Sequence, residues 1–392
     1  MKVLQLHNEY RVHGGENVVL DRDRADLEAA GHEVVRYNVT NQAGAAETLG
    51  ALALAPWNPR EARKVARIIE AERPDVIHVH NTWFRLSPAS IAVASKMGLP
   101  IVHTLHNFRW LCVNGEMIRD GVTCRVCVSS SRLSAVKYRC YRGSVPLSIV
   151  AATTGEISER RGIWSRHIDR FIALTPRARE LFSTWGFPED RIVVRPHRIS
   201  DPGARSLPPS QSDTVLYAGR VSEAKGVEDL CRIWTSLPRP QQLVVIGDGP
   251  IAGDLAGAFP DVVFVGHLEL DEVTAWMRRS RALILPTRGE EAFPLVVVEA
   301  MACGIPVALS DVALVRDYVR QVGSGWTFDV QRRSEWERVL SLVEDDEAVD
   351  DGGARSREVY ERNFAADGAH SLVAVYEEAI KHRNARTSAK PE

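Results

Sequence analysis

The chain has 392 residues, of which 45% are hydrophobic and 26% are charged, and its formal net charge is −2 at pH 7. This length exceeds one ordinary hydrophobic core and predicts two domains of about 150 to 200 residues each. A net charge this small provides no bulk field that attracts nucleic acid, so we expect no nucleic-acid partner and look for local anion sites.

The N-terminal residues, Met1 to Tyr10, lack the long apolar stretch of a signal peptide. No window of the sequence approaches about 18 uninterrupted apolar residues, so we expect no membrane-spanning helix. We therefore expect a cytoplasmic protein, in which the six cysteines are reduced thiols or metal ligands.

In the first half of the chain, short β-branched runs alternate with helical patterns. One helix is predicted to begin at Pro59, because Asn58 is a capping residue and proline suits the first helical position. Strands that alternate with helices predict a parallel sheet that is covered on both faces. The runs predicted to be strands are Lys2–His7, His32–Tyr37, Asp75–His80, Pro100–Leu105, Arg170–Leu174 and Arg191–Arg195.

The same alternation starts again after a segment rich in Pro, Ser and Gly, residues 200–213, which is typical of a linker. We therefore predict two doubly wound α/β domains, 1–199 and 214–367, that face each other across a cleft. The predicted strands of the second domain are Thr214–Gly219, Gln242–Gly247, Val262–Gly266, Ala282–Pro286, Pro306–Ser310 and Trp326–Val330.

The first strand of each predicted domain is followed by a glycine-containing loop. Gly14 and Gly15 open a helix in the first domain, and Gly219 precedes Arg220 and Lys225 in the second. Glycine lets backbone amides approach an anion at a helix N-terminus, and two cations of different geometry suit a diphosphate. The alternatives are a plain strand-to-helix turn for the glycines and a solvated surface pair for the cations. Neither loop has the G-x-G-x-x-G spacing, which argues against a dinucleotide site.

The most unusual stretch is EEAFPLVVVEAMACGIPV, Glu290–Val307. Its apolar run predicts a helix over Leu295–Cys303, with Glu299 on the helix and Glu291 in the loop before its first turn. A carboxylate within such an apolar run is poorly placed unless it has a partner or a ligand. The alternative is that both glutamates are ordinary exposed helix carboxylates.

Four motifs occur here in an order and spacing that resemble the family-four retaining glycosyltransferases of GT-B fold. They are YAGRVSEAKGVEDL, VVIGDGP, VVFVGHL and LPTRGEEAFPLVVVEAMACGIPVALSD. The resemblance covers nearly the whole chain, and its most specific element is the glutamate pair with seven residues between its members. It implies two Rossmann-like domains, the first binding the acceptor and the second the nucleotide sugar. It also implies that a helix within 368–392, ahead of a frayed tail, crosses back to the first domain.

The resemblance also implies a role for each matching residue. Glu299 is expected to accept from the ribose hydroxyls and Glu291 from hydroxyls of the transferred sugar, because a carboxylate accepts two hydroxyl donors. His106 matches a family histidine that reaches toward the transferred sugar, unless it is a strand-end histidine tied to backbone; His80 is either an acceptor-side residue or structural. The implied catalytic set is His106, Arg220, Lys225 and Glu291. The implied donor-binding set is Gly14, Gly15, Gly219, Arg220, Lys225, Gly266, His267, Glu291, Phe293, Pro294, Leu295 and Glu299. Pro294 departs from the expected amide lining, since proline has no N–H.

The reaction implied by the resemblance is transfer of a hexosyl group from a nucleoside-diphosphate sugar to a hydroxyl acceptor, forming an α-glycoside by front-face displacement. No catalytic cofactor is expected, because Arg220, Lys225 and helix N-termini compensate the charge of the diphosphate. The D-x-D sequence at Asp21–Asp23 falls within the first helix pattern and is discounted as a metal site. Two other functions stay open, a sugar-nucleotide epimerase of the same fold and a non-catalytic nucleotide-sugar-binding protein.

A cysteine-rich segment, about 107–146, is predicted to be an insertion on the acceptor side. Its four cysteines have a C-x-x-C pair at the centre, which is typical of a tetrahedral zinc site. Structural zinc, free thiols and disulfides all stay open for Cys112, Cys124, Cys127 and Cys140. Cys231 and Cys303 fall in helical patterns and are expected to be small core residues.

The acceptor is the least determined feature. Basic and aromatic residues recur in NPREARKVAR, VKYRCYR and ERRGIWSRH of the first half, and such surfaces suit anionic lipid heads and a lipid-linked acceptor. The alternative is a solvated basic helix face. We therefore leave the acceptor open among glycans, lipid-linked saccharides and small metabolites, with peripheral contact at the inner face of the membrane as one option.

Overall fold

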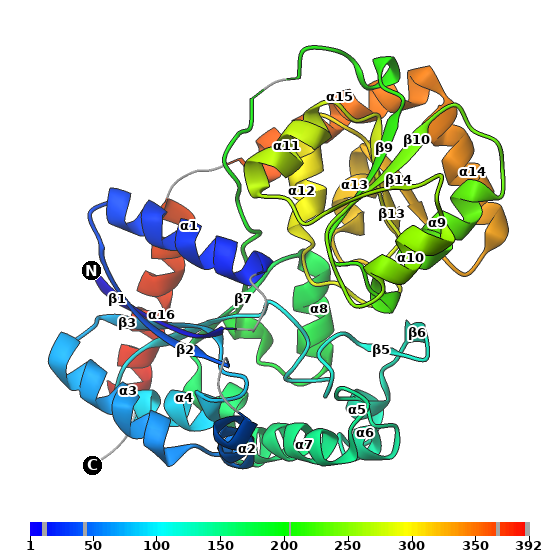
Figure 1. Cartoon of the computed structure of the whole chain (residues 1–392). Helices are drawn as coiled ribbons and strands as arrows, with labels where there is room; N and C mark the ends of the chain where they lie inside the picture. The colour runs from blue at the N-terminus through cyan, green and yellow to red at the C-terminus, as the bar shows by residue number, and fades with distance from the viewer. Residues whose placement is uncertain (10–13, 42–44, 204, 366–368, 389–392) are drawn as a thin grey trace. The chain divides into compact units, whose positions relative to one another are not determined.

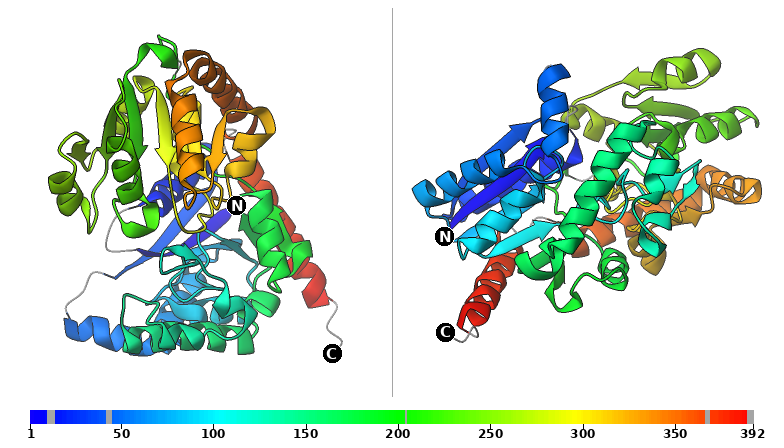
Figure 2. Two further views of the ribbon diagram at one scale, coloured as in Figure 1. Left: turned by 90° about the vertical axis from the view of Figure 1, so that its right-hand side faces the viewer. Right: turned by 90° about the horizontal axis from the view of Figure 1, so that it is seen from below.

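The computed structural model describes residues 1–9, 14–41, 45–203, 205–365 and 369–388, and the chain divides into two units (Figure 1). The first unit comprises Met1–Met117, Arg125–Arg195 and Asp367–Glu392, and the second comprises Ile118–Cys124 and Pro196–Ala366. Each unit is built on one six-stranded parallel sheet, with helices on both sides (Figure 2). This arrangement confirms the predicted fold class of two parallel α/β domains.

The sheet of the first unit has the strand order β2-β1-β3-β4-β7-β8. Its central strands β3 and β4 are buried along their whole length, because helices cover both faces of the sheet. The strands are β1 (Lys2–Glu9), β2 (Glu33–Thr40), β3 (Val76–Asn81), β4 (Ile101–Thr104), β7 (Arg170–Ala173) and β8 (Ile192–Val194). The helices are α1 (Gly15–Ala29), α2 (Ala45–Leu54), α3 (Pro59–Glu72), α4 (Ser87–Lys96), α5 (Val126–Ser129), α6 (Ser134–Lys137), α7 (Val145–Arg160), α8 (Pro176–Thr184) and α16 (His370–Ser388), with short turns at Ile163–His167 and Glu189–Arg191.

The sheet of the second unit has the strand order β11-β10-β9-β12-β13-β14. The strands are β9 (Thr214–Ala218), β10 (Gln242–Ile246), β11 (Val263–Gly266), β12 (Ala282–Leu285), β13 (Val307–Ser310) and β14 (Gly325–Phe328). The helices are α9 (Val227–Thr235), α10 (Ala252–Ala258), α11 (Leu270–Arg278), α12 (Leu295–Ala302), α13 (Arg316–Val322), α14 (Arg333–Glu344) and α15 (Asp346–Asn363), with 3-10 turns at Pro209–Gln211 and Glu223–Lys225.

In both units the first strand of the sheet is an inner strand. β1 lies between β2 and β3, and β9 lies between β10 and β12, so the strand order reverses direction at these positions. Ligands of doubly wound sheets bind beyond the carboxyl ends of the strands at such a reversal. The loops that follow β1, β3 and β4 in the first unit, and β9 and β12 in the second, are therefore the places to look for a site.

All twelve predicted strands are present, and each predicted end lies within three residues of the observed one. The predicted capping of α3 is also confirmed, since the Asn58 side chain accepts from the backbone N–H groups of Arg60 (3.1 Å) and Glu61 (3.2 Å). The hairpin of β5 (Ile118–Arg119) and β6 (Val122–Thr123) was not predicted. Strands of two residues give no alternating pattern to detect.

Residues of the predicted linker, 200–213, group with the second unit. There Ser210 donates to the carboxylate of Asp350 from its backbone N (2.8 Å) and its Oγ (2.7 Å). The helix α16 groups with the first unit and packs on its sheet (Figure 1). Fully buried Asp169 accepts from His382 Nδ1 (2.9 Å) and Arg383 Nη2 (2.6 Å) of this helix. None of the helices in the described residues is long and apolar enough to cross a membrane.

A close backbone approach fixes the loop that follows β9. Gly247, just after β10, has φ +127°, and a Cβ built on it would lie 1.9 Å from the carbonyl oxygen of Gly219. Only glycine fits there, because any side chain overlaps backbone that cannot move aside. The shape of the Gly219 loop therefore depends on Gly247.

We expect Gly247→Ala to lower the free energy of unfolding of the protein by at least about 2 kcal/mol, through this overlap and the unfavourable φ. The matched control is Gly253→Ala on α10, where an added Cβ meets nothing within 4 Å. The control should be neutral or stabilise by up to about 1 kcal/mol, because alanine favours helix. Urea denaturation monitored by circular dichroism measures both; equal effects of the two substitutions would contradict the role assigned to Gly247.

Candidate functional site

The loop after β9 in the second unit presents cations at the end of a buried strand. Tyr217 is fully buried, and its hydroxyl donates to the carbonyl oxygen of Arg220 at 2.8 Å, which holds the loop against the strand. The Arg220 side chain is exposed and forms no ion pair with any other residue that the structure describes. A guanidinium that is held by its backbone and open to solvent is suited to an incoming anion.

The loop after β12 is joined to the loop after β9. The backbone N–H of Arg288 donates to the carbonyl of Ala224 at 2.9 Å, and the Arg288 side chain pairs with Asp229 on α9. Gly226 has φ +69°, and an added Cβ would lie 2.1 Å from the carbonyl oxygen of Pro286. These contacts keep the two loops side by side at the point where the strand order reverses.

The ammonium group of Lys225 contacts a carboxylate oxygen of Glu291, so the two loops also meet through opposite charges. The Lys225 side chain is 29% exposed and that of Glu291 is 15% exposed. The backbone N–H of Leu314 donates to the carbonyl oxygen of Glu291 at 3.0 Å and fixes the loop from the other side. The structure thus brings together two residues of the predicted catalytic set that lie 66 positions apart.

The second predicted glutamate is on the helix that follows. α12 begins at Leu295 after the N-cap Pro294, and Glu299 is half-buried on it, whereas Glu291 precedes the helix, as predicted. The opposite face of α12 is packed in the core, where Val297, Val298, Ala300 and Met301 are fully buried. Anchoring of this kind leaves the N-terminal end of α12 fixed beside the loop that carries Glu291.

The other predicted donor-binding residues of the second unit differ in exposure. Phe293 is half-buried and its ring meets His197 edge to face, with centroids 5.4 Å apart. Gly266 ends β11 with φ +75° and open space around it, and His267 is exposed next to it. The carbonyl of Gly266 accepts from Gly247 N at 2.7 Å, which links the end of β11 to the loop after β10.

The first unit contains a pocket at the carboxyl ends of β3 and β4. His80 and His106 line it from the strand ends, and Trp110 lines it from the segment that follows β4. Helix α7 lines it with small side chains at helical spacing: Ala151, Thr154, Gly155 and Ser158. The lining contains Arg109 and no carboxylate, so the pocket suits neutral or anionic ligands.

The histidines around this pocket are neutral. His103 Nδ1 lies 2.9 Å from the carbonyl oxygen of Val79, which can only accept, so Nδ1 carries the proton; Nε2 then accepts from Trp110 Nε1 at 2.7 Å. Burial lowers the pKa of His103 to about 4. Burial, with smaller contributions from His7 and His103, lowers the pKa of His106 to about 3. A neutral imidazole both donates and accepts, which suits hydroxyl ligands.

His106 forms a pair with His80, since His106 Nε2 lies 3.0 Å from His80 Nδ1 and the rings stack with centroids 5.3 Å apart. His80 is 3% exposed, and burial lowers its pKa well below the usual value. Because one ring must donate and the other must accept, the pair fixes the orientation of His106. The imidazole of His106 therefore has a side-chain partner, and its role toward the transferred sugar stays a prediction.

Gly14 and Gly15 also lie in the first unit, at the start of α1, and both are exposed. The next residue, Glu16, was not predicted as a site residue. Its Oε1 accepts from Asn107 Nδ2 at 3.0 Å, its Oε2 is buried with no hydrogen-bond partner among the described residues, and burial raises its pKa to about 7. Asn107 follows His106 and lines the pocket, so Glu16 supports the edge of the pocket.

All six cysteines are free thiols in the structure. Cys112 lies beside Cys127, whose thiol hydrogen bond lowers the pKa of Cys112 to about 6 and outweighs burial, which raises it. Among the residues that the structure describes, no group of three or more His, Cys, Asp or Glu side chains is arranged to hold a metal ion. Zinc ligation by Cys112, Cys124, Cys127 and Cys140 therefore stays a prediction. Cys231 and Cys303 are buried in the core of the second unit, as expected.

Sequence reasoning missed the α7 side of the pocket. The signal was present in SIVAATTGEIS, residues 148–158, where small residues recur at positions 151, 154, 155 and 158, the spacing of one helix face. Such a stripe of small residues also fits simple helix packing. Only the position of α7 against the ends of β3 and β4 identifies it as the wall of a pocket.

Two family models match the chain. The model described as "Glycosyl transferase 4-like domain" matches residues 14–197, and the model described as "Glycosyl transferases group 1" matches residues 212–345. The D-inositol 3-phosphate glycosyltransferase of Xylanimonas cellulosilytica is 26% identical over 339 residues, covering 80% of this chain and 74% of that protein. The first match lies inside the range predicted for the first domain, 1–199, whereas the second begins at residue 212, within the predicted linker, and ends inside the range predicted for the second domain, 214–367.

Two solved structures have the same fold. Sucrose-phosphate synthase from Thermosynechococcus elongatus aligns with a TM-score of 0.69 at 17% identity, covering 99% of this chain and 100% of that one. HepE of Anabaena, in complex with UDP-glucose, aligns with a TM-score of 0.65 at 15% identity, covering 98% of this chain and 100% of that one. Likeness at this identity shows the architecture.

The neutral state of His103 predicts how stability depends on pH. A histidine whose pKa is lower in the folded than in the unfolded chain takes up a proton on unfolding, so its contribution is complete above about pH 6.5 and is lost as the pH falls toward 4. His103→Gln removes this proton uptake. Between pH 6.5 and 4 the variant should lose stability less steeply than the wild type, by up to about 1.4 kcal/mol per pH unit.

Urea denaturation at a series of pH values measures this difference. His78, His80, His106 and Glu16 titrate in both proteins and cancel in the comparison. Parallel curves for His103→Gln and the wild type would show that His103 is not held neutral.

Proposed function

Because the chain belongs to the GT-B glycosyltransferases, with a glycosyl transferase 4-like domain followed by a group 1 domain, we propose that it transfers a hexosyl group from a nucleoside-diphosphate sugar to a hydroxyl acceptor with retention of anomeric configuration. The observation that carries the proposal is the contact between Lys225 and Glu291 at the reversal point of the second sheet. The ammonium group of Lys225 there lies beside a carboxylate that can accept hydrogen bonds from hydroxyl groups. A nucleotide sugar has the matching arrangement, a diphosphate next to a ring that carries several hydroxyl groups.

In this proposal Arg220 and Lys225 bind the diphosphate. Arg220 offers a planar fork of donors and Lys225 a mobile point charge, so together they follow the charge as it grows on the departing diphosphate. Donors that are fixed before the reaction stabilise this charge without reorganising. The buried hydroxyl of Tyr217 and the close approach of Gly247 to Gly219 provide the fixed loop.

Glu291 and Glu299 accept from hydroxyl groups in the same proposal. Glu291 moves from Lys225 to hydroxyls of the transferred sugar when the diphosphate takes Lys225, and Glu299, farther along α12, accepts from the ribose. Leu295 is the first helical residue and has a backbone N–H for the phosphate or sugar, whereas the N-cap Pro294 has none. Support for a nucleotide sugar also comes from HepE, whose structure contains UDP-glucose.

The reaction follows as a front-face displacement. The acceptor hydroxyl forms a bond to the anomeric carbon on the face from which the diphosphate leaves, the bond from that carbon to the diphosphate oxygen breaks, and the diphosphate oxygen takes the hydroxyl proton. No protein base is needed, and the product is an α-glycoside when the donor is α-linked. The electrostatic contribution of this chain comes from Arg220 and Lys225.

The acceptor is proposed to bind in the pocket of the first unit. His106 and His80 are neutral there, so each can exchange hydrogen bonds with hydroxyl groups. The positive charge of Arg109 can compensate the charge of an anionic acceptor. The relative from Xylanimonas cellulosilytica is named a D-inositol 3-phosphate glycosyltransferase, and its name describes a polyol acceptor with one anionic group. An acceptor of that kind suits this pocket. We propose a hydroxyl acceptor of glycan, lipid-linked or small polyol type, consistent with the family's place in glycan biosynthesis.

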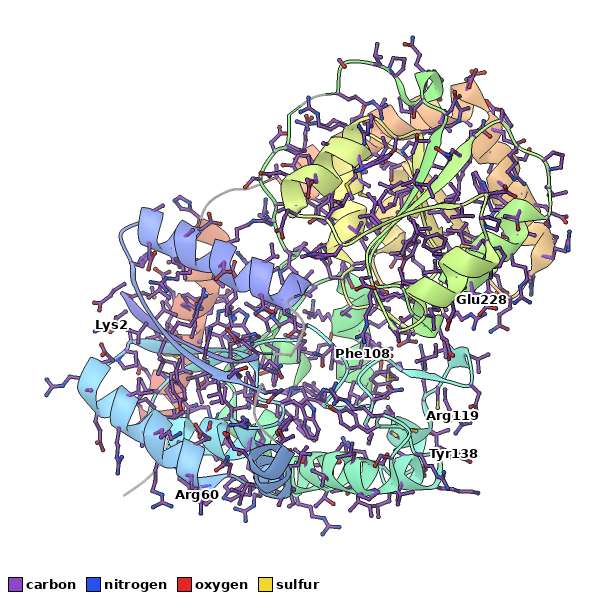
Figure 3. The ribbon with its side chains drawn as sticks, viewed as in Figure 1. Lys2, Arg60, Phe108, Arg119, Tyr138 and Glu228 are labelled. Atoms are coloured by element: carbon purple, nitrogen blue, oxygen red, sulfur yellow. The ribbon has the colours of Figure 1, made fainter. Side chains whose placement is uncertain are left out.

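We expect Lys225→Ala and Glu291→Ala each to lower turnover by a factor of about 10² to 10³, because each removes a charged partner of the diphosphate sugar. Release of nucleoside diphosphate from a panel of nucleotide sugars, with a hydroxyl acceptor present, measures turnover. The matched controls are Arg232→Ala and Glu228→Ala, which break an exposed ion pair on α9 of the same unit. Glu228 is labelled in Figure 3. These controls should keep turnover within about twofold of the wild type, because exposed ion pairs contribute little.

Wild-type turnover of both site variants would contradict the proposed site. Conversion of the donor sugar to its epimer in the absence of an acceptor would instead identify an epimerase. Chromatography of the nucleotide sugars after incubation with donor alone detects this conversion.

A further inference from the structure

Exposed large hydrophobic side chains gather on one part of the first unit. Four of them lie between residues 133 and 149, namely Leu133 (58% exposed), Tyr138 (43%), Val145 (38%) and Ile149 (46%). Of the described residues, only three others of this kind are as exposed, and all three belong to the second unit. Single exposed apolar residues are common, but a cluster of them marks an interaction surface.

Leu133 and Tyr138 flank α6, Val145 and Ile149 lie on α7, and the two helices pack on each other. α6 contacts α7, and the backbone N–H of Tyr141 donates to Ser148 Oγ at 3.0 Å. Ala135 of α6 and Ala151 and Ala152 of α7 are buried between these helices and the unit, which turns the other faces outward. Val145 and Ile149 are one helical turn apart and form one ridge.

The same part of the chain is strongly basic. Residues 121–149 contain five Lys and Arg residues and no Asp or Glu, although the whole chain carries a net charge of −2. Lys137, Arg139 and Arg142 are exposed, and none of them forms an ion pair within the described part of the chain. Lys137 lies over the ring of Tyr138, with its Nζ 5.5 Å from the ring centroid.

We propose that these side chains form a docking surface for an anionic lipid bilayer. The lipid-docking surface comprises Leu133, Lys137, Tyr138, Arg139, Arg142, Val145 and Ile149. Apolar side chains that enter the headgroup region, ringed by cations that meet anionic headgroups, are the combination that holds proteins at membrane surfaces. A protein partner is the alternative occupant of this surface.

The docking surface shares helix α7 with the pocket of the first unit. Ala151, Thr154, Gly155 and Ser158 face the pocket, while Val145 and Ile149 face outward near the start of the helix. A helix with its side chains is about 10 to 12 Å across, so a bilayer on the outer face lies within reach of a lipid-linked acceptor in the pocket. This inference goes beyond the proposed function and does not depend on it, because docking needs neither donor nor turnover.

Flotation of the full chain with vesicles tests the proposal. Wild-type protein should float with vesicles of equal parts phosphatidylglycerol and phosphatidylcholine, and its partition coefficient should be at least tenfold lower for phosphatidylcholine alone. The triple variant Lys137→Glu, Arg139→Glu, Arg142→Glu should lower binding to anionic vesicles by about tenfold or more. The double variant Leu133→Ser, Ile149→Ser should lower it by about tenfold, through loss of apolar contact.

The matched control is the double variant Leu207→Ser, Leu270→Ser, which removes two equally exposed leucines from the second unit and should bind vesicles like the wild type. Circular dichroism and release of nucleoside diphosphate with a soluble acceptor should be unchanged in all three variants, which separates this test from that of the proposed function. Absence of vesicle binding by the wild type, or equal binding by surface and control variants, would overturn the proposal. A change of oligomeric state in the surface variants, measured by light scattering, would overturn it in favour of a protein interface.

Discussion

The contact between Lys225 and Glu291 joins the loops that follow β9 and β12, the two strands at which the order of the second sheet reverses. A partly buried charge needs a partner, and here each residue is the partner of the other. When a diphosphate pairs with Lys225, the carboxylate of Glu291 can accept a hydrogen bond from another group. The loop geometry that makes this exchange available comes from backbone contacts, chiefly those of Gly247 with Gly219 and of Gly226 with Pro286.

The two units use different electrostatics for their candidate sites. The second unit presents charged groups, with Arg220 open to solvent beside the Lys225–Glu291 pair. The first unit surrounds its pocket with imidazoles that burial keeps neutral, such as His103 and His106. A nucleoside diphosphate carries charge that must be compensated, whereas an acceptor hydroxyl needs only hydrogen-bond partners of neutral type. This division agrees with a donor site in the second unit and an acceptor site in the first.

Much of the fold was predictable from the sequence because its strands are buried on both faces. The short β-branched runs of β3 and β4 predict strands, and the apolar run that follows Pro294 predicts the helix α12. The hairpin Ile118–Thr123 was missed because its strands have two residues each. Local pattern thus identifies elements that are long or wholly buried.

The site was predictable only in part. Glu291, Lys225 and Arg220 belong to motifs, so the resemblance to a family identified them, but their contact across 66 positions is a product of strand order. The pocket of the first unit combines β3, β4 and α7, and no local motif contains all three. Glu16 was missed because a glutamate in the first turn of a helix is usual, and its burial against Asn107 appears only in three dimensions. The predicted cleft between the domains and the zinc site stay predictions.

Calorimetric titration with nucleoside diphosphates and the matching nucleotide sugars tests the central claim, that Lys225 binds diphosphate and Glu291 binds sugar. Of UDP, GDP, ADP and dTDP, the one that binds the wild type most tightly is then titrated into Lys225→Ala and Glu291→Ala as well. Lys225→Ala should weaken binding of the diphosphate by about tenfold or more, as expected for loss of a charged hydrogen bond. Glu291→Ala should bind the diphosphate at least as well as the wild type but lose affinity for the nucleotide sugar. Equal weakening of both ligands by both variants, or no binding of any nucleoside diphosphate to the wild type, would contradict it.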